Sequence, residues 1–167
     1  MMEPKVQAAF RKSNATERYM QLSKRYQVAI DEQYEDYEIK RVLEIIDGLG
    51  FKATHDTKEN FFKIVFREQN YKFQLNISLK YGEVDLIWCV WKEQELIEGS
   101  PLGVLVKWDI GSDKHIFRPA FRNDEELGQL LAEAIQMFND FKAAVLDEYK
   151  IEKNEEGFDV YRGFGKN

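Results

Sequence analysis

Two histidines and one cysteine are the side chains best suited to acid–base or nucleophilic chemistry. His55 precedes Asp56, and His115 follows Asp113 by two residues. An imidazole beside a carboxylate can act as an oriented base, whereas isolated pairs in turn-rich segments are more often solvated side chains. Cys89 lies in an apolar stretch, while a catalytic thiolate needs an electropositive, partly exposed site. We therefore expect no catalytic residue, and we expect Cys89 to be a buried thiol.

The common motifs of enzymes and cofactor sites are missing from the sequence. It has no CxxC, HxxxH or HExxH pattern for a metal, and no GxxxxGK[ST] or GxGxxG loop for a nucleotide. The GxSxG elbow of the serine hydrolases is absent too. We therefore expect no cofactor and no metal. An enzyme that uses His55 or His115 without a recognisable motif remains an alternative.

One acidic segment stands out from the rest of the chain, because it holds five carboxylates and two tyrosines in eight residues. Its charged and aromatic members are Asp31, Glu32, Tyr34, Glu35, Asp36, Tyr37 and Glu38. Rigid tyrosines among carboxylates are well suited to gripping a basic protein, so this segment is our candidate partner-binding surface. The alternative is a solvated junction whose tyrosines pack on the core.

Bulk composition predicts one domain over residues 1–167. The chain is 44% hydrophobic, which provides enough apolar side chain for a core. One cysteine and the lack of an apolar leader favour the cytoplasm, and no apolar run reaches the ~18 residues of a membrane span. With 30 acidic against 24 basic residues, the net charge of −6 argues against nucleic acid and permits a basic protein partner.

Apolar spacing in the first third of the chain predicts two helices. An amphipathic stripe that begins after a capping box at Asn14–Glu17 predicts a helix that extends to Tyr37. A second helix is predicted from Ile39 to Leu49, because glycines at its end favour termination. Residues 1–14 and the polar tail 152–167 are the candidates for fraying, although the tail is also compatible with docking.

The middle of the chain predicts an antiparallel meander of five or six strands. Tyr71 to Leu79 alternates strictly between apolar and polar side chains, as a strand with one buried face does. The predicted strands are 51–55, 62–67, 71–79, 84–91, 103–110 and 115–118, with a polar loop at 92–101.

The last element is a long helix that begins after a capping box at Asn123–Glu126. Its apolar stripe includes Leu127, Leu131, Phe138 and Phe141 and needs a partner surface. The apolar side chains of 71–79 supply one. The sequence therefore predicts an α+β fold with two N-terminal helices, a meander sheet and a C-terminal helix packed on the sheet.

Three functions are compatible with these features. The first is a small non-catalytic binding protein, such as a bacterial immunity protein that neutralises a toxin, since these proteins are compact, acidic and poor in catalytic motifs. The second is a secretion-chaperone-like α+β adaptor, which a dimer would favour. The third is an enzyme, which a pocket holding a histidine next to Asp or Glu would favour. The first two are analogies at the level of class.

Overall fold

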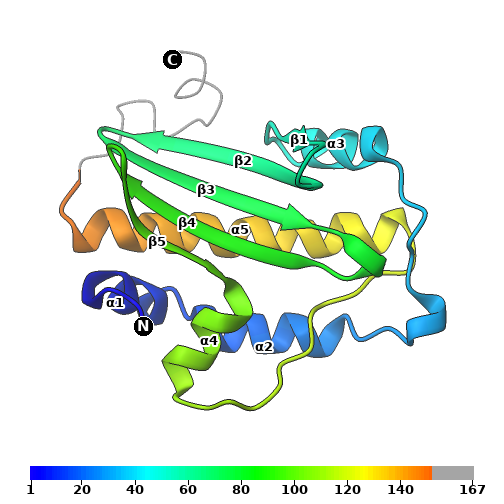
Figure 1. Ribbon diagram of the computed structural model, residues 1–167, viewed down its shortest axis with the longest axis horizontal. Helices are drawn as coiled ribbons and strands as arrows, with labels where there is room; N and C mark the ends of the chain where they lie inside the picture. The colour runs from blue at the N-terminus through cyan, green and yellow to red at the C-terminus, as the bar shows by residue number, and fades with distance from the viewer. Residues whose placement is uncertain (152–167) are drawn as a thin grey trace.

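The computed structural model describes residues 1–151 as an α+β fold, with helices packed against an antiparallel sheet (Figure 1). The helices are α1 (Pro4–Lys12), α2 (Ala15–Arg25), α3 (Ile39–Gly48), α4 (Leu102–Ile110) and α5 (Asp124–Glu148), with 3₁₀ turns η1 (Ile30–Glu32) and η2 (Lys80–Gly82). The strands are β1 (Thr54–Asp56), β2 (Phe61–Glu68), β3 (Tyr71–Ser78), β4 (Asp85–Lys92) and β5 (Glu95–Pro101). Our prediction for the tail 152–167 lies outside the described residues.

The sheet is a meander, because its strand order β1-β2-β3-β4-β5 follows the chain and every neighbouring pair is antiparallel. In β3 the buried residues are Tyr71, Phe73, Leu75 and Ile77, and the residues between them are half-buried. This confirms the predicted alternation. One face of the sheet is therefore apolar and requires a cover.

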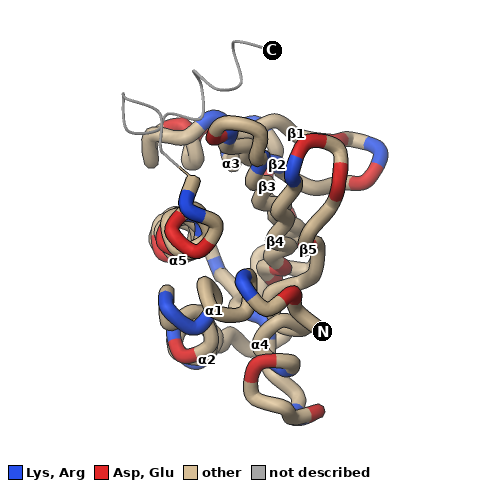
Figure 2. The backbone as a smooth tube through the Cα atoms, turned by 90° about the vertical axis from the view of Figure 1, so that its left-hand side faces the viewer, with Lys and Arg blue, Asp and Glu red and all other residues tan. Residues whose placement is uncertain are grey.

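Helix α5 provides that cover. The side chain of Asn123 accepts a hydrogen bond from the Glu126 amide at 2.9 Å, which confirms the predicted start of the helix. The Phe138 ring lies 5.8 Å from the Phe66 ring and 5.5 Å from the Trp88 ring, centroid to centroid. Figure 2 shows α5, α1 and α2 on the same side of the sheet. The predicted packing of the C-terminal helix on the sheet is confirmed.

Residues 1–14, a candidate for fraying, instead contribute to the core through α1. Phe10 is fully buried, and its ring lies 5.7 Å from the Trp88 ring. The predicted helix start at Asn14 is confirmed, since α2 begins at Ala15, but the predicted capping box does not form. Asn14 has a left-handed φ of 57° and makes no side-chain cap hydrogen bond, so it turns the chain between α1 and α2 instead.

The predicted helix to Tyr37 is also wrong, because α2 ends at Arg25 and most of 26–38 is extended. Backbone pairing competes with the helix here, since the Tyr26 carbonyl accepts a hydrogen bond from the Ala120 amide at 2.8 Å. Ile30, a member of the predicted apolar stripe, is 87% exposed. The tyrosines of this extended segment pack on the core, and their spacing happens to match the period of a helix. This coincidence explains the wrong prediction. The second predicted helix is confirmed as α3.

Two predictions around Pro101 are wrong. The expected loop 92–101 contains β5, whose polar character is typical of an edge strand. The expected strand 103–110 is helix α4, in which Leu102, Leu105 and Val106 are the buried positions at helical spacing. Gly111 caps this helix in the left-handed conformation. Packing of the Leu105 face has overridden the strand preference of the valines.

The expected strand 115–118 is irregular, and the only pairing nearby within residues 1–151 is a single bridge between Glu83 and Ala120. That bridge ties 119–121 to the start of β4 without forming a sixth strand. None of the helices within residues 1–151 combines the length and the apolar character that a membrane crossing requires.

Candidate functional site

The predicted acidic segment lies in an extended connection between α2 and α3, residues 26–38, which we call the strap. Two backbone hydrogen bonds hold the strap to the segment before α5. Ala120 donates to the Tyr26 carbonyl at 2.8 Å, and Tyr34 donates to the Phe121 carbonyl at 2.9 Å. Phe121 in turn donates to the Gly82 carbonyl at 3.0 Å. The strap is therefore fixed to the end of the sheet through an intermediate segment.

Gly82 is required for this arrangement. Its φ is +73°, and a Cβ built on it would lie 2.7 Å from the Tyr34 nitrogen. Real Cβ atoms do not come so close to backbone. Only glycine therefore allows the strap to lie against η2 without displacement.

The structure separates the two kinds of side chain in the acidic segment. All five carboxylates are exposed: Asp31, Glu32, Glu35, Asp36 and Glu38. Tyr34 and Tyr37 are half-buried, and their rings lie 6.1 Å and 6.5 Å from the ring of Phe121. The pKa of Tyr37 is raised, chiefly by burial. The carboxylates thus face solvent while the tyrosines anchor the strap to the core.

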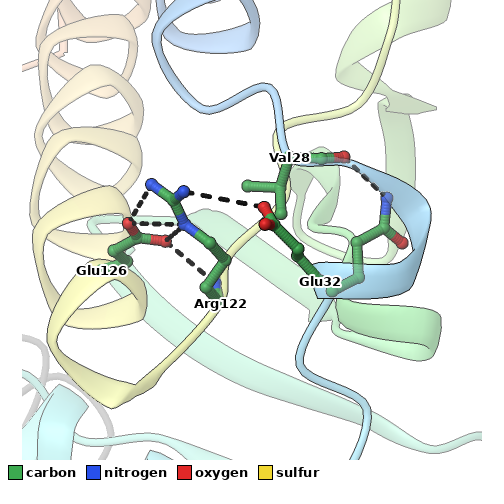
Figure 3. Close-up of polar contacts among 5 residues, drawn as sticks. Val28, Glu32, Arg122 and Glu126 are labelled. Carbon is green, nitrogen blue, oxygen red and sulfur yellow. Dashed lines mark hydrogen bonds and ion pairs between the residues drawn. The ribbon is translucent and has the colours of Figure 1, made fainter.

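Arg122 links the strap to α5 (Figure 3). Its guanidinium lies 2.7 Å from Glu126 and 3.8 Å from Glu32. The hydrogen bond to Arg122 lowers the pKa of Glu126. Within the strap, the Gln33 amide donates to the Val28 carbonyl at 3.3 Å and closes the turn at η1. The exposed ion pairs of Arg122 orient the strap more than they stabilise the fold.

Three hollows share Glu83 and Arg118 in their walls. The largest, about 360 Å³, is bounded on one side by Gln27 to Ala29 and by Gln33 of the strap. The second, about 210 Å³, lies beside η2. The third, about 220 Å³, reaches α2 and α4, and we call it the Tyr19 hollow. We call the three together the groove, and only the first of them is lined by strap residues.

The side chain of Tyr19 lines the hollow that carries its name. Tyr19 belongs to α2 and is 2% exposed, yet it lines the hollow beside Gly103, where a built Cβ would meet its hydroxyl at 3.8 Å. Burial raises the pKa of Tyr19 to about 12. Asp85 at the start of β4 raises it further, whereas Arg118 opposes this effect. The hydroxyl is therefore a neutral hydrogen-bonding group in a charged surrounding.

Neither histidine has a carboxylate partner within residues 1–151. His55 pairs with the Asn60 side chain at 3.1 Å. His115 is exposed, and its ring packs at 4.7 Å on the Phe117 ring. It lines the Tyr19 hollow together with Glu83, but no described hydrogen bond or ion pair joins the two. This geometry lacks the oriented base that general base catalysis uses.

Cys89 is buried on the sheet face opposite α5, which confirms the predicted buried thiol. Burial raises its pKa, and Lys72 nearby opposes that effect. The thiol form is thus favoured at neutral pH, so Cys89 is a poor nucleophile. In the part of the chain that the structure describes, no three His, Cys, Asp or Glu side chains come together as a metal site would require.

The fold and the site define a class, an α+β protein with an acidic strap that forms part of the wall of the groove. Compared with protein-family models, with curated proteins and with solved structures, the chain matches none. Sequence reasoning missed the groove entirely. Tyr19, Glu83, Asp85 and Arg118 come from separate segments, and their spacing along the chain carries no motif.

Proposed function

We propose that this chain is a non-catalytic binding protein whose partner is a basic protein. One observation carries the proposal: five exposed carboxylates are presented on a strap that backbone hydrogen bonds and Gly82 hold in place. A fixed group of like charges attracts an oppositely charged protein and speeds its encounter. A pre-ordered strap also has less conformational entropy to lose on binding than a flexible one.

The partner we favour is a bacterial toxin, which would make this chain an immunity protein. Nuclease toxins carry positive charge because their substrate is a phosphate backbone. An acidic surface of fixed shape suits the inhibition of such a protein. The net charge of −6 agrees with this proposal.

The test compares two double charge reversals in the kinetics of binding to the partner captured from the native host. Glu35→Lys with Asp36→Lys alters the strap. Glu93→Lys with Glu95→Lys makes the same change in net charge at exposed positions of the β4–β5 hairpin. We expect the strap variant to slow association by about tenfold or more and to flatten its salt dependence. We expect the hairpin variant to change association by less than about threefold, since its charges lie at the other end of β4.

An equal effect of the two variants would show that only net charge matters, and the proposal would fail. A larger effect of the hairpin variant would move the partner site to residues 92–101. Thermal melts of both variants accompany the kinetics, because a variant that unfolds cannot report on a surface.

An enzyme is the second candidate, because His115 lines a hollow together with Glu83 and Asp85. We rank it second, since no described hydrogen bond or ion pair orients the imidazole. If an activity is found, His115→Ala and His55→Ala should each leave it within about tenfold, as losing a general base usually removes 10²–10⁴. A larger loss in either variant would favour the enzyme.

A further inference from the structure

The sheet face turned away from α5 has no helix over it within residues 1–151. In Figure 1, α5 passes behind β3 and β4, and Figure 2 shows α1 and α2 on that same side. The centre of the uncovered face consists of three cross-strand rows: Lys63 with Asn76 and Ile87, Val65 with Gln74 and Cys89, and Arg67 with Lys72 and Trp91. We call these rows the basic face, because they contain lysine and arginine but no carboxylate.

Positive charge is concentrated on the basic face. Arg67 lies directly opposite Lys72, and like charges in that position destabilise a sheet. Burial lowers the pKa of Lys72, and Arg67 and Lys63 lower it further, whereas no carboxylate is among the described groups that shift it. Neither Lys63 nor Lys72 takes part in an ion pair within residues 1–151. An acidic ligand would relieve this repulsion.

The basic face also has an apolar part. Trp91 is paired with Leu96 of β5, whose side chain is 48% exposed. The Lys72 ammonium lies 4.6 Å from the centre of the Trp91 ring. Nucleic acids bind sheets by stacking bases on aromatic rings, and Lys72 covers the one aromatic ring of these rows. The face therefore fits an acidic protein segment that also carries an exposed apolar side chain.

The strap is a segment of this kind. Asp31, Glu35, Asp36 and Glu38 are exposed, and no ion pair within residues 1–151 involves them. Ile30, directly before them, is 87% exposed. Backbone hydrogen bonds hold the strap in place, so little conformational entropy is lost when it binds.

The strap of the same chain cannot reach the row of Arg67 and Lys72. That row lies beside the β2–β3 hairpin, at the left-hand end of the sheet in Figure 1, whereas the strap lies at the right-hand end. Along β3, Lys72 and Ser78 are about 20 Å apart, at roughly 3.3 Å per residue. A contact between the strap and this row therefore joins two chains.

We infer that the basic face binds the strap of a second copy of this chain. Carboxylates of the strap pair with Lys63 and Lys72, and Ile30 packs on Trp91 and Leu96. The inference goes beyond the proposed function, since it needs no other protein. Its consequence is competition, because self-association covers the carboxylates that attract the basic partner.

Sedimentation equilibrium of the full chain at up to about 1 mM detects an association with a Kd near 1 mM. We expect the average mass to rise with protein concentration. The rise should disappear in about 1 M NaCl, where the screening length is roughly 3 Å. A chain that stays monomeric over the whole range overturns the inference.

A charge swap identifies the two surfaces. The face variant, Lys63→Glu with Lys72→Glu, and the strap variant, Glu35→Lys with Asp36→Lys, should each weaken self-association by about tenfold or more, because like charges then meet. Their mixture should associate again, since each reversed surface meets its complement. A mixture that stays monomeric overturns the inference.

Two controls accompany the swap. Lys114→Glu with Lys150→Glu makes the same change in net charge as the face variant, at exposed positions outside the sheet, and should keep the Kd within about threefold. An equal effect of this control would overturn the inference. Lys63→Gln with Lys72→Gln removes charge without reversing it. It should weaken self-association by about threefold or more, which keeps the test decisive if the face variant unfolds.

The indole signal of Trp91 reports the contact directly. The ¹⁵N-labelled strap variant, whose basic face is intact, is titrated with the unlabelled face variant, whose strap is intact. The Trp91 signal should shift, whereas that of the fully buried Trp88 should not. Oligothymidylate is the competing ligand, and a larger shift with it would assign the face to nucleic acid and overturn the inference.

The face variant separates this inference from the proposed function. Its strap is intact, so its association with the captured partner should stay within about threefold of the unaltered chain at concentrations where both are monomeric. If self-association fails, the strap kinetics still decide the proposed function. If the charge swap succeeds while the strap variant binds the partner normally, the inference stands and the proposed function fails.

Discussion

Replacing Gly82 with alanine should release the strap. Two terms set the magnitude. The left-handed conformation, with φ of +73°, is unfavourable for alanine by about 1–2 kcal/mol. The new Cβ would also lie 2.7 Å from the Tyr34 nitrogen, so the strap must retreat and the 2.9 Å bond from Tyr34 to Phe121 breaks, a loss of about 0.5–1.5 kcal/mol. The expected destabilisation is the sum, about 1.5–3.5 kcal/mol.

Gly111→Ala is the matched control, because Gly111 also has a left-handed φ, +64°, but a Cβ there would meet nothing within 4 Å. Gly111→Ala should destabilise the fold only through the unfavourable left-handed conformation, by about 1–2 kcal/mol. Urea melts give both free energies of unfolding, and hydrogen exchange reports the Tyr34 amide. We expect that amide to lose protection in Gly82→Ala alone. Equal destabilisation by the two variants, with the Tyr34 amide still protected, would refute the account of how the strap is held.

Three further predictions concern the core and two titrating groups. Phe138→Ala should destabilise the fold by about 3–5 kcal/mol, whereas Gln129→Ala on the exposed side of α5 should stay within about 0.5 kcal/mol; a difference below 1 kcal/mol in denaturant melts would make α5 peripheral. The pKa of Tyr19 is raised to about 12, so the folded state holds this proton more tightly and stability should fall between pH 10 and 12. Tyr19→Phe should abolish that part of the loss, about 2–3 kcal/mol, and an unchanged alkaline profile would contradict it. The pKa of Glu126 is lowered by Arg122, so its stabilising contribution is present above the unfolded pKa of about 4.3 and is lost as pH falls through the folded pKa. Melts of Glu126→Gln and the unaltered chain should therefore differ at pH 6 and converge in acid.

The spacing of apolar residues predicted the secondary structure correctly where a segment buries one continuous face. Strand β3 and helix α5 each bury one continuous face, and their apolar residues therefore recur at the period of the element. Turn residues such as Gln69, with φ of 54°, marked the hairpin between β2 and β3. The α+β class and the meander followed from these elements.

The same reasoning failed where contacts from distant segments decided the structure. Tyr34 and Tyr37 reach Phe121 from an extended strap, and their spacing imitated a helix. In α4 the valines favour a strand, but Leu105 and Val106 become buried only in a helix that packs against α2 and β4. Neither the extended strap nor helix α4 can be predicted from neighbouring residues alone, because the surface that each packs against comes from elsewhere in the chain.

The groove depends on the two segments whose secondary structure was predicted wrongly. Because 102–110 is helical, Gly103 lies against the Tyr19 hydroxyl and closes one wall of the hollow. Because 26–38 is extended, Gln33 can form a wall beside Arg118. If the strap were helical and 103–110 were a strand, Glu83 and Asp85 would lie at the end of the sheet without these walls beside them. The acidic residues were visible in the sequence, but the hollow that Glu83 and Asp85 line arises only from tertiary packing.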